Sequence, residues 1–248
     1  MRELDRNPSA SSTLERCAIV GAGRLGHALA TALTEAGIEV EGPLGRGARP
    51  DAPVVLLTVP DAEIRTAAES LPLNAQLVGH CSGATTLDVL GDHEGFSLHP
   101  LMTVPEGGRA NFAGAGCAVA GTTPRALAMA NGLATALRMR PVEVADRDRA
   151  AYHAAASIAA NFLVTLEGQA ERLAATAGVP REHLVPLARA ALENWAANGA
   201  EQALTGPVAR KDEATIERQR AAIQERAPDL LDTFDALVAA SRVLLAAA

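Results

Sequence analysis

The sequence feature that most constrains the fold is a glycine cluster between an apolar segment and a helical pattern. Residues 17–20 are apolar, the glycines follow as Gly21-x-Gly23-x-x-Gly26, and an Ala/Leu-rich stretch then runs as far as Gly37. A strand, a glycine turn and a helix in this order are typical of a βαβ unit that binds a dinucleotide. The first glycine permits the tight turn after the strand, the second lets a pyrophosphate approach the backbone, and the third lets the helix pack closely on the strand. The residues predicted to bind the phosphates at the helix N-terminus are Gly21, Ala22, Gly23, Arg24, Leu25 and Gly26.

Strand-like and helix-like segments alternate from this unit to about residue 144. The expected strands are residues 17–20, 38–44, 54–59, 76–79, 96–99, 116–120 and 141–144, and the expected helices are residues 27–36, 61–70, 86–90 and 124–137. Such alternation predicts an α/β fold with a doubly wound, mostly parallel sheet. Residues 45–53 are too few and too rich in Gly and Pro for a crossover helix, so we expect the second unit to be abbreviated.

The rest of the chain has no strand pattern. From about Arg147 it consists of helical segments rich in Ala, Leu, Glu and Arg, with breaks at Gly178-Val-Pro180, Gly199 and Thr205-Gly-Pro207. We therefore expect three parts, which are a flexible lead at 1–13, a dinucleotide-binding domain at 14–146, and an all-helical substrate and dimerisation domain at 147–248. A helical domain of mainly small apolar residues tends to cover its flank with a second copy, so we expect a homodimer.

Composition argues against several kinds of partner. The net charge is −7 and aromatic residues make up 2% of the chain, which argues against a nucleic-acid surface. The first residues carry charge where a signal peptide would be apolar, and no apolar run is long enough for a membrane span. Cys17, Cys81 and Cys117 have no CxxC spacing, so we expect reduced core thiols in a cytoplasmic protein and no metal site.

Several candidate site residues come at strand ends, because a ligand lies beyond the carboxyl ends of the strands in an open α/β sheet. Val59 and Pro60 come at the end of the third strand and are predicted to line the ribose and nicotinamide side of the cofactor. The alternative is that this turn serves only as a helix cap, through Asp61. His80 and His99 end the next two strands and are expected in one cleft, either in contact with substrate or as hydrogen-bonded structural histidines.

The first helix of the second half carries His153, Ser157 and Asn161 at a spacing of four residues. Reduction of a carbonyl or an imine needs a proton, and histidine titrates near neutral pH. We predict that His153 donates this proton and that Asn161 anchors a carbonyl or hydroxyl group, while His99 and Ser82 orient the substrate. The alternative is a polar stripe that satisfies a domain or subunit interface.

A second polar segment follows in the helical half, at residues 204–215. Thr205, Arg210 and Lys211 are predicted to contact an anion or the substrate. The alternative is a simple helix junction, in which Gly206 and Pro207 end one helix and Asp212 caps the next.

The choice between NAD and NADP depends on where the second strand ends. Glu41 lies at about the distance after the glycines that is typical of a carboxylate gripping the ribose 2′-hydroxyl of NAD. If the strand extends to Leu44, its tip instead carries Arg46, which together with Arg49 could hold the 2′-phosphate of NADP. We therefore favour NADP over NAD.

Six motifs, spread over nearly all of the chain after Thr13, carry a resemblance to a known family. They are Gly21-Ala-Gly-Arg-Leu-Gly26, Val59-Pro-Asp61, His80-Cys-Ser-Gly83, Ser97-Leu-His-Pro100, Tyr152-His-Ala-Ala-Ala156 with Asn161, and Leu204-Thr-Gly-Pro-Val-Ala-Arg210 followed by Asp212. In this order they resemble the Rossmann-like proteins that carry the domain of unknown function DUF2520, in the 6-phosphogluconate dehydrogenase-like superfamily. The resemblance implies a Rossmann sheet followed by a helical domain. It also implies NADP, because Arg46 matches an arginine that follows the second strand in the family pattern.

The relatives in this superfamily include pyrroline-5-carboxylate reductases, ketopantoate reductases and hydroxyacid dehydrogenases. The last two use a lysine on the first long helix after the nucleotide domain, whereas the only lysine here is Lys211. Either His153 takes the place of that lysine or the reaction differs. The resemblance implies an NADP-dependent oxidoreductase that reduces a small 2-oxo acid or imino acid, with a ketopantoate-type substrate as the leading candidate. The alternative is a nucleotide-binding sensor or regulatory protein without turnover.

Overall fold

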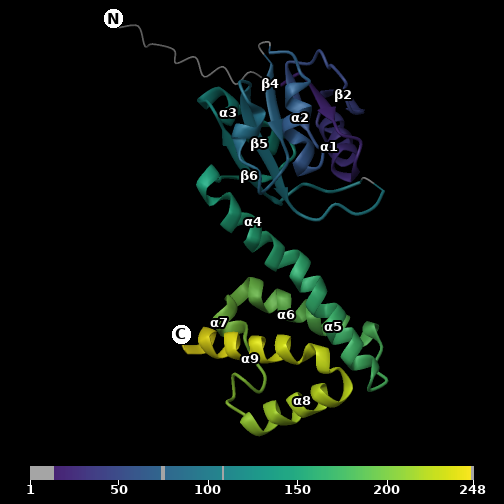
Figure 1. Ribbon diagram of the computed structural model, residues 1–248, viewed down its shortest axis with the longest axis vertical. Coiled ribbons are helices and arrows are strands. Elements are labelled where there is room, and N and C mark those ends of the chain that lie inside the picture. The colour runs from purple at the N-terminus through teal and green to yellow at the C-terminus, as the bar shows by residue number, and fades with distance from the viewer. Residues whose placement is uncertain (1–13, 74–75, 108, 247–248) are drawn as a thin grey trace, which may run out of the picture. The chain divides into compact units, whose positions relative to one another are not determined.

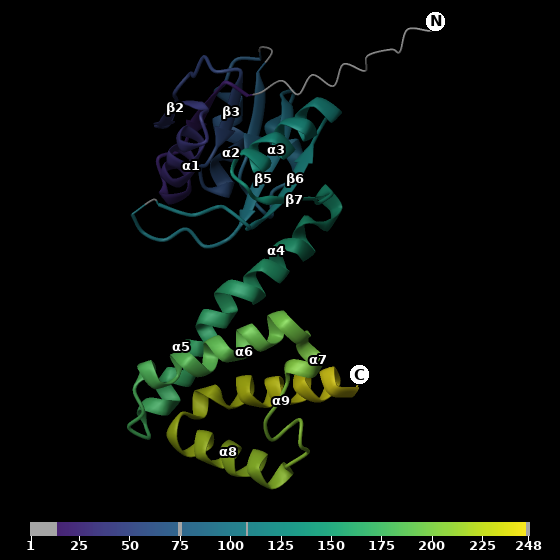
Figure 2. The same cartoon turned by 180° about the vertical axis from the view of Figure 1, so that it is seen from behind.

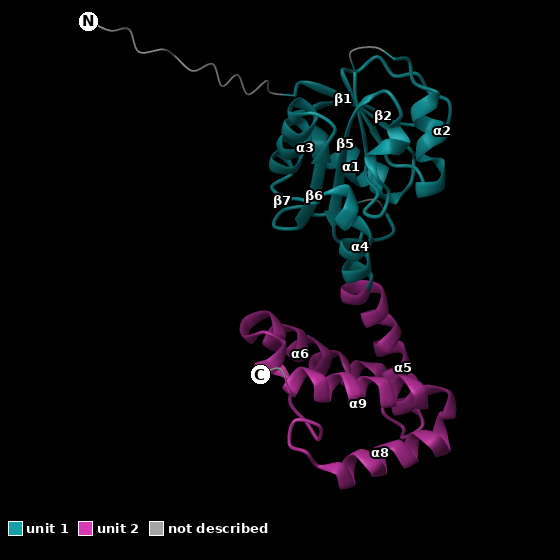
Figure 3. Ribbon diagram, turned by 60° about the vertical axis from the view of Figure 1, so that its left-hand side comes forward, with its two compact units in different colours: residues 1–157 teal, residues 158–248 magenta. Residues whose placement is uncertain are grey.

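The computed structural model describes residues 14–73, 76–107 and 109–246, and the lead predicted at 1–13 lies outside them. The chain divides into two compact units, residues 1–157 and 158–248 (Figure 3). We call them unit 1 and unit 2 and describe each by itself. The sequence-based boundary at residue 147 marks where the alternating pattern ends, and the division by contacts follows Ser157.

Unit 1 is a sheet with helices on both faces (Figure 1). The strands are β1 (Arg16–Val20), β2 (Glu39–Leu44), β3 (Val54–Leu57), β4 (Leu77–His80), β5 (Glu94–Leu101), β6 (Gly116–Gly121) and β7 (Arg140–Glu143). The helices are α1 (Arg24–Glu35), α2 (Ile64–Glu69), α3 (Pro124–Ala136) and α4 (Arg149–Ser157), with 3₁₀ turns at Asp61–Glu63, Leu87–Leu90 and Asp146–Asp148. The strand order is β2-β1-β3-β4-β5-β6-β7, and every pair is parallel except β5 with β6. The predicted doubly wound, mostly parallel sheet is therefore confirmed.

The sheet separates two apolar cores, because successive side chains of a strand point to opposite faces. In β1, Cys17 and Ile19 belong to the core covered by α1 and α3, whereas Ala18 and Val20 belong to the core covered by α2. The central strands β3 and β4 are buried along their whole length, as expected for parallel strands covered on both faces.

The ends of β2 and β3 border the candidate site. β2 runs to Leu44 after a register shift opposite β1, and no helix joins it to β3, as the Gly- and Pro-rich linker predicted. β3 ends at Leu57, two residues earlier than expected. The reason is local, because Thr58 bonds back to β1 and Val59 and Pro60 form the turn into the next helix.

The described residues of unit 2 form helices joined by loops and no strand (Figure 2). A π-helical turn (Ile158–Phe162) leads into α5 (Leu163–Ala175), followed by α6 (Val185–Asn198), α7 (Ala200–Ala203), α8 (Glu213–Arg226) and α9 (Leu231–Ala246). Its buried apolar cluster is small and centres on Ile223, Ala227 and Leu230. In neither unit is a helix of the described residues long and apolar enough to cross a membrane.

Candidate functional site

In the turn after β1, packing within the protein leaves no room for a side chain at two of the three glycines. Gly21 has a φ of +123°, and a Cβ there would lie 2.7 Å from the backbone of Thr58. A Cβ at Gly26 would lie 1.9 Å from the carbonyl oxygen of Gly21. A Cβ at Gly23, in contrast, would meet no heavy atom within 4 Å. Packing therefore explains Gly21 and Gly26, while Gly23 faces open space at the N-terminus of α1.

Thr58 fixes this turn, and the sequence analysis did not single it out. Its hydroxyl donates a hydrogen bond to the Gly21 carbonyl (2.9 Å), and its amide donates to the Val20 carbonyl (2.8 Å). The amide of Gly21 in turn donates to the carbonyl of Leu44 (2.9 Å). Three neighbouring strands thus hold the turn in one conformation. A threonine inside an apolar strand pattern gives no sign of this role.

Two cavities in unit 1 meet at the glycine turn. The larger, about 620 Å³, is lined by Val20, Gly21, Ala22, Gly23, Leu44, Gly45, Arg46, Gly47, Thr58, Val59, Pro60, Ala62, Glu63, Thr66, Ala67 and Ser70. The smaller, about 400 Å³, is lined by Gly23, Arg24, Leu25, Thr58, Val59, Pro60, Asp61, Cys81, Ser82 and Val104. Both include Gly23, so an elongated ligand that passes over this glycine can occupy both. Eight of the nine residues predicted to bind the cofactor line one or both cavities, and Gly26 lies beneath the turn.

The tip of β2 presents Arg46 to the larger cavity. Its Nη2 lies 2.7 Å from Glu63 Oε1, and the Arg46 side chain is 84% exposed. Glu41, the residue that would favour NAD, lies within β2, and its carboxylate accepts hydrogen bonds from Arg16 Nη2 (3.1 Å) and the Asp51 amide (3.3 Å). Glu41 is therefore engaged away from the tip, while Arg46 is accessible there.

The hydroxyl of Ser82 makes hydrogen bonds within its own loop and to the turn after β3. The hydroxyl lies 2.7 Å from Asp61 Oδ2 and accepts hydrogen bonds from the amides of Ala84 (3.2 Å) and Thr85 (3.0 Å). Asp61 makes no side-chain cap at the following 3₁₀ turn, so the reading of this position as a helix cap is wrong. The pair instead ties the turn after β3 to the loop after β4. The substrate-orienting role of Ser82 stays a prediction.

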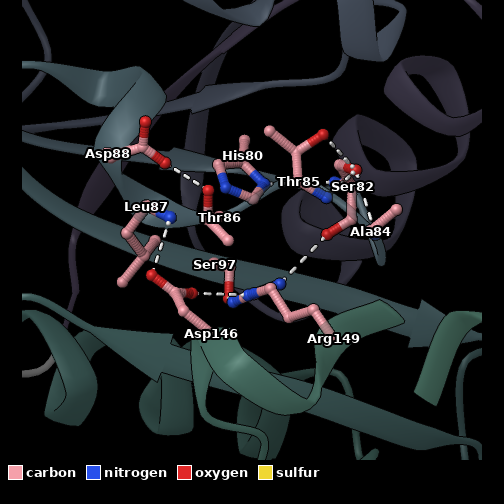
Figure 4. A network of polar contacts seen from close by, with 10 residues as sticks. All are labelled: His80, Ser82, Ala84, Thr85, Thr86, Leu87, Asp88, Ser97, Asp146 and Arg149. Atoms are coloured by element: carbon pink, nitrogen blue, oxygen red, sulfur yellow. Dashed lines mark hydrogen bonds and ion pairs between the residues drawn. The ribbon is translucent and has the colours of Figure 1, made fainter. Parts of the chain in front are cut away.

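Arg149 is buried at the start of α4, with only 1% of its side chain exposed. Its Nε donates to Asp146 Oδ1 (2.7 Å), Nη1 to the Ser82 carbonyl (3.4 Å), and Nη2 to the Ser97 hydroxyl (Figure 4). Asp146 also accepts a hydrogen bond from the Leu87 amide (3.1 Å). A buried guanidinium is tolerated because its donors are paired. The network attaches α4 to β5 and to the loop after β4.

His80, at the end of β4, is fully buried and does not reach a cavity. Its Nδ1 accepts a hydrogen bond from the Ser82 amide (3.2 Å). Burial, followed by the charge of Arg149, lowers the pKa of His80 to about 4. The ring is therefore neutral near pH 7, and of the two readings of His80 the geometry favours the structural one.

His99 and His153 come together in unit 1, although 54 positions in the sequence separate them. Their ring centroids lie 6.4 Å apart, and His99 Nδ1 lies 2.7 Å from the hydroxyl of Tyr152. A Cβ on Gly83 would lie 2.8 Å from His99 Cε1 and 3.0 Å from His153 Cδ2, so both rings pack on this backbone. Burial, followed by the charges of His153 and Arg149, lowers the pKa of His99 to about 4. Burial also raises the pKa of Tyr152 to about 12.

The other predicted site residues lie in unit 2. Asn161 is exposed in the π-helical turn, whose wider repeat means that the α-helical spacing assumed from Ser157 onward does not hold. Thr205, Arg210 and Lys211 are exposed between α7 and α8. Asp212 caps α8 as expected, by accepting a hydrogen bond from the Thr215 amide (3.0 Å). Contact of these four candidate residues with substrate stays a prediction.

No metal site is formed by the residues that the structure describes, since they include no cluster of three or more His, Cys, Asp or Glu side chains that could hold an ion. The linings of the two cavities at the glycine turn do not include His99 or His153, and the polar groups around His99 form a separate cluster in unit 1. These comprise a neutral imidazole, a phenol and a second, exposed imidazole.

Comparison with known proteins gives one family and a set of similar folds. The family described as Domain of unknown function (DUF2520) matches residues 115–241, and no curated protein matches the sequence. A Bacteroides fragilis protein described as an NADP oxidoreductase is similar with a TM-score of 0.78 at 18% identity, over 92% of this chain and 98% of that chain. A reductive aminase from Aspergillus terreus in complex with NADPH gives 0.63 at 18% identity, over 93% and 96%. The 1-pyrroline-5-carboxylate reductase of Streptococcus pyogenes gives 0.61 at 12% identity, over 92% and 98%. At these identities the similarity establishes the fold.

Proposed function

The chain belongs to the family that carries the domain of unknown function DUF2520, and we propose that it is an NADP-dependent oxidoreductase. The observation that carries the proposal is the open space in front of Gly23, where the two cavities meet at the N-terminus of α1. Backbone amides at a helix N-terminus suit a pyrophosphate. In support, one similar fold is described as an NADP oxidoreductase and another is a complex with NADPH.

The residues around the cavities fit the parts of the cofactor. The phosphates would lie on the turn from Gly21 to Gly26, and the adenosine end in the larger cavity, beside Arg46. Val59 and Pro60 would line the nicotinamide side in the smaller cavity. Arg46, with the exposed Arg49 nearby in sequence, would hold the 2′-phosphate, and this favours NADP over NAD. When bound, the reduced nicotinamide supplies a hydride.

The chain's own groups would supply the proton and the orientation of the substrate. Reduction of a C=O or C=N bond places negative charge on the oxygen or nitrogen, which must take up a proton. His153 is exposed on α4 and would donate it, while His99 would hold the substrate as a neutral hydrogen-bonding group. This division of roles needs no lysine, in agreement with the lack of one in unit 1.

The substrate we propose is a small 2-oxo acid or imino acid, with a ketopantoate-type compound as the first candidate. In support of the imino acid, the Streptococcus pyogenes protein of similar fold is a 1-pyrroline-5-carboxylate reductase. In unit 2, Asn161 would anchor the carbonyl or hydroxyl group. Thr205, Arg210 and Lys211 carry the polar and positive groups that a substrate carboxylate requires.

We also propose that the protein is a homodimer through unit 2 and that it works in the cytoplasm. Apolar side chains on α6 and α9 are left uncovered, with Leu187 70% exposed, Trp195 56% and Val243 71%. Exposed apolar patches of this kind are typical of interaction surfaces. The three cysteines are free and buried, which suits a reducing compartment.

Calorimetric titration with NADPH tests the cofactor site. Gly23→Val should abolish binding, because its side chain would fill the space that we assign to the pyrophosphate. The matched control is Gly132→Val on α3, where an added Cβ also meets no heavy atom within 4 Å but no cavity is lined. Undiminished NADPH binding by Gly23→Val would remove the proposed site.

Turnover is tested with a panel of small 2-oxo acids and cyclic imines, monitored by the loss of NADPH absorbance. We expect oxidation of NADPH with at least one compound and loss of that activity in His153→Ala. Tight NADPH binding without turnover of any compound would instead favour a nucleotide-binding sensor, for which the missing lysine is the supporting observation.

A further inference from the structure

Tyr152 is the residue around His99 that the proposed reaction does not yet use. It is the only tyrosine of the chain and lies on α4, directly before His153. Its hydroxyl is 2.7 Å from His99 Nδ1, and the two rings meet edge to face with centroids 5.6 Å apart. The contact joins β5 to α4 and lies within unit 1.

The direction of this hydrogen bond follows from what each group can do. A phenol has one proton to donate, and among the described residues His99 Nδ1 is its one hydrogen-bond partner. If the phenol donates to Nδ1, the bond uses that proton, and the neutral imidazole carries its own proton on Nε2. If Nδ1 donated instead, the phenol proton would have no acceptor among the described residues. The first arrangement is therefore favoured.

The position of Tyr152 is set by buried contacts. Arg149 lies one helical turn before it, and its bonds to Ser97 and to the Ser82 carbonyl attach this end of α4 to the sheet. On the other side, the backbone of Gly83 packs against the rings of His99 and His153. The imidazole of His99 is thus held between a fixed phenol and a fixed backbone.

A neutral imidazole in this setting acts as a hydrogen-bond donor rather than as an acid. Burial, followed by the charges of His153 and Arg149, lowers the pKa of His99 to about 4, so the ring keeps a single proton at neutral pH. No hydrogen bond occupies Nε2 among the residues that the structure describes, and the space beside this atom is open because residue 83 is a glycine, since a Cβ there would lie 2.9 Å from Nε2. An oriented N–H donor stabilises the charge that develops on a carbonyl oxygen or an imine nitrogen.

We propose, on the premise of the reductase described above, that Tyr152 is a positioning residue that keeps the proton of His99 on Nε2. His99 Nε2–H then donates a hydrogen bond to the reacting oxygen or nitrogen of the substrate. The proton transferred in the reaction comes from His153, so His99 keeps its own. In this proposal His99 is the fixed hydrogen-bond donor and His153 is the source of the transferred proton.

The test reads the tautomer of His99 directly, by long-range ¹H–¹⁵N NMR of imidazole nitrogens in the protein without cofactor. The wild type should show a protonated Nε2 and an unprotonated Nδ1. Tyr152→Phe removes only the hydroxyl and should give a mixture of both tautomers. Ser157→Ala, on the same helix, is the matched control and should leave the His99 signals unchanged. A wild-type proton on Nδ1, or an unchanged tautomer in Tyr152→Phe, would overturn the proposal.

Once the substrate panel has given an active compound, measurement of kcat provides a second test of the role of Tyr152. Tyr152→Phe should lower kcat by about tenfold to a hundredfold while the Kd for NADPH stays the same, since only the donor to the substrate is disturbed. An unchanged kcat would overturn the proposed role. If no compound is turned over, the oxidoreductase proposal fails, but the tautomer measurement still decides whether Tyr152 positions His99.

Discussion

The two units differ in where they keep their polar and apolar side chains. In unit 1 a buried polar network lies near the site, in which Arg149 is paired with Asp146 and Ser97, and apolar side chains fill two cores. In unit 2 the buried apolar cluster is small, and residues such as Leu187 and Trp195 are exposed. Unit 1 therefore contains what it needs to hold its site in one geometry. Unit 2 leaves apolar side chains exposed, and this is the basis of the proposed dimer.

The largest effect should come from breaking the buried network of unit 1. Arg149→Met would leave Asp146, Ser97 and the Ser82 carbonyl without their donor, and it should lower the free energy of unfolding by about 3 kcal/mol. In unit 2, Arg172→Met removes an exposed ion pair with Asp229 and should cost less than about 1 kcal/mol. Urea unfolding followed by circular dichroism measures both. Equal losses would mean that the units do not differ in this way.

An acid-dependent loss of stability should follow from His80. Its pKa is lowered from 6.5 to about 4 in the folded protein, so between these values the unfolded chain binds a proton that the folded chain does not. The free energy of unfolding should therefore fall by about 3 kcal/mol from this residue as the pH drops through that window. Urea midpoints at a series of pH values measure this.

The control for this pH dependence is a matched pair of variants. His80→Asn keeps an acceptor for the Ser82 amide but cannot take up a proton in this range, so it should make the pH profile shallower and leave the contribution of His99, whose pKa is lowered to the same value. His183→Asn changes an exposed histidine of unit 2 and should leave the profile as it is. A profile as steep in His80→Asn as in the wild type would show that His80 does not contribute to the acid sensitivity.

A smaller effect is expected at the tip of β2. Arg46→Ala should raise the Kd for NADPH about tenfold, because it removes a charge-assisted contact to the 2′-phosphate, while the Kd for NADH should not change. Arg210→Ala in unit 2 is the matched control and should leave both dissociation constants unchanged. If Arg46→Ala weakens NADH as much as NADPH, the phosphate assignment is wrong.

The smallest effect on the folded chain should come from the uncovered face of unit 2. Leu187→Gln should change the stability of a protomer by less than about 0.5 kcal/mol, since the side chain is 70% exposed. In sedimentation velocity, however, it should shift the protein from dimer to monomer. Val142→Gln, at an exposed apolar position of unit 1, should not. A wild-type protein that sediments as a monomer would exclude the dimer.

Local patterns in the sequence predict most of unit 1. Apolar runs such as residues 54–57 are typical of buried parallel strands, and the spacing of Gly21, Gly23 and Gly26 is meaningful only in a strand–turn–helix context. Both features depend on neighbours in the chain, so the strands and the glycine turn could be found without the structure. The π-helical turn at Ile158–Phe162 left no comparable signal.

Residues that act through distant partners could not be found in this way. Arg149 stands in a run of alternating Asp and Arg, which reads as a solvated surface, and only the folded chain brings Ser97 to it. Thr58 and Asp61 are similar cases, because their partners Gly21 and Ser82 come from other strand ends. His99 and His153 are both predicted as site residues from the sequence, but their closeness, and the contact of Tyr152 with His99, depend on how α4 packs on β5.

The single tryptophan of the chain gives unit 2 a spectroscopic signal of its own. Trp195 lies in unit 2, whereas the single tyrosine, Tyr152, lies in unit 1. Indole fluorescence can be excited at wavelengths at which a phenol does not absorb, so in an unlabelled sample it reports on unit 2. The indole is 56% exposed, so a second copy that covers this part of unit 2 would shift its emission.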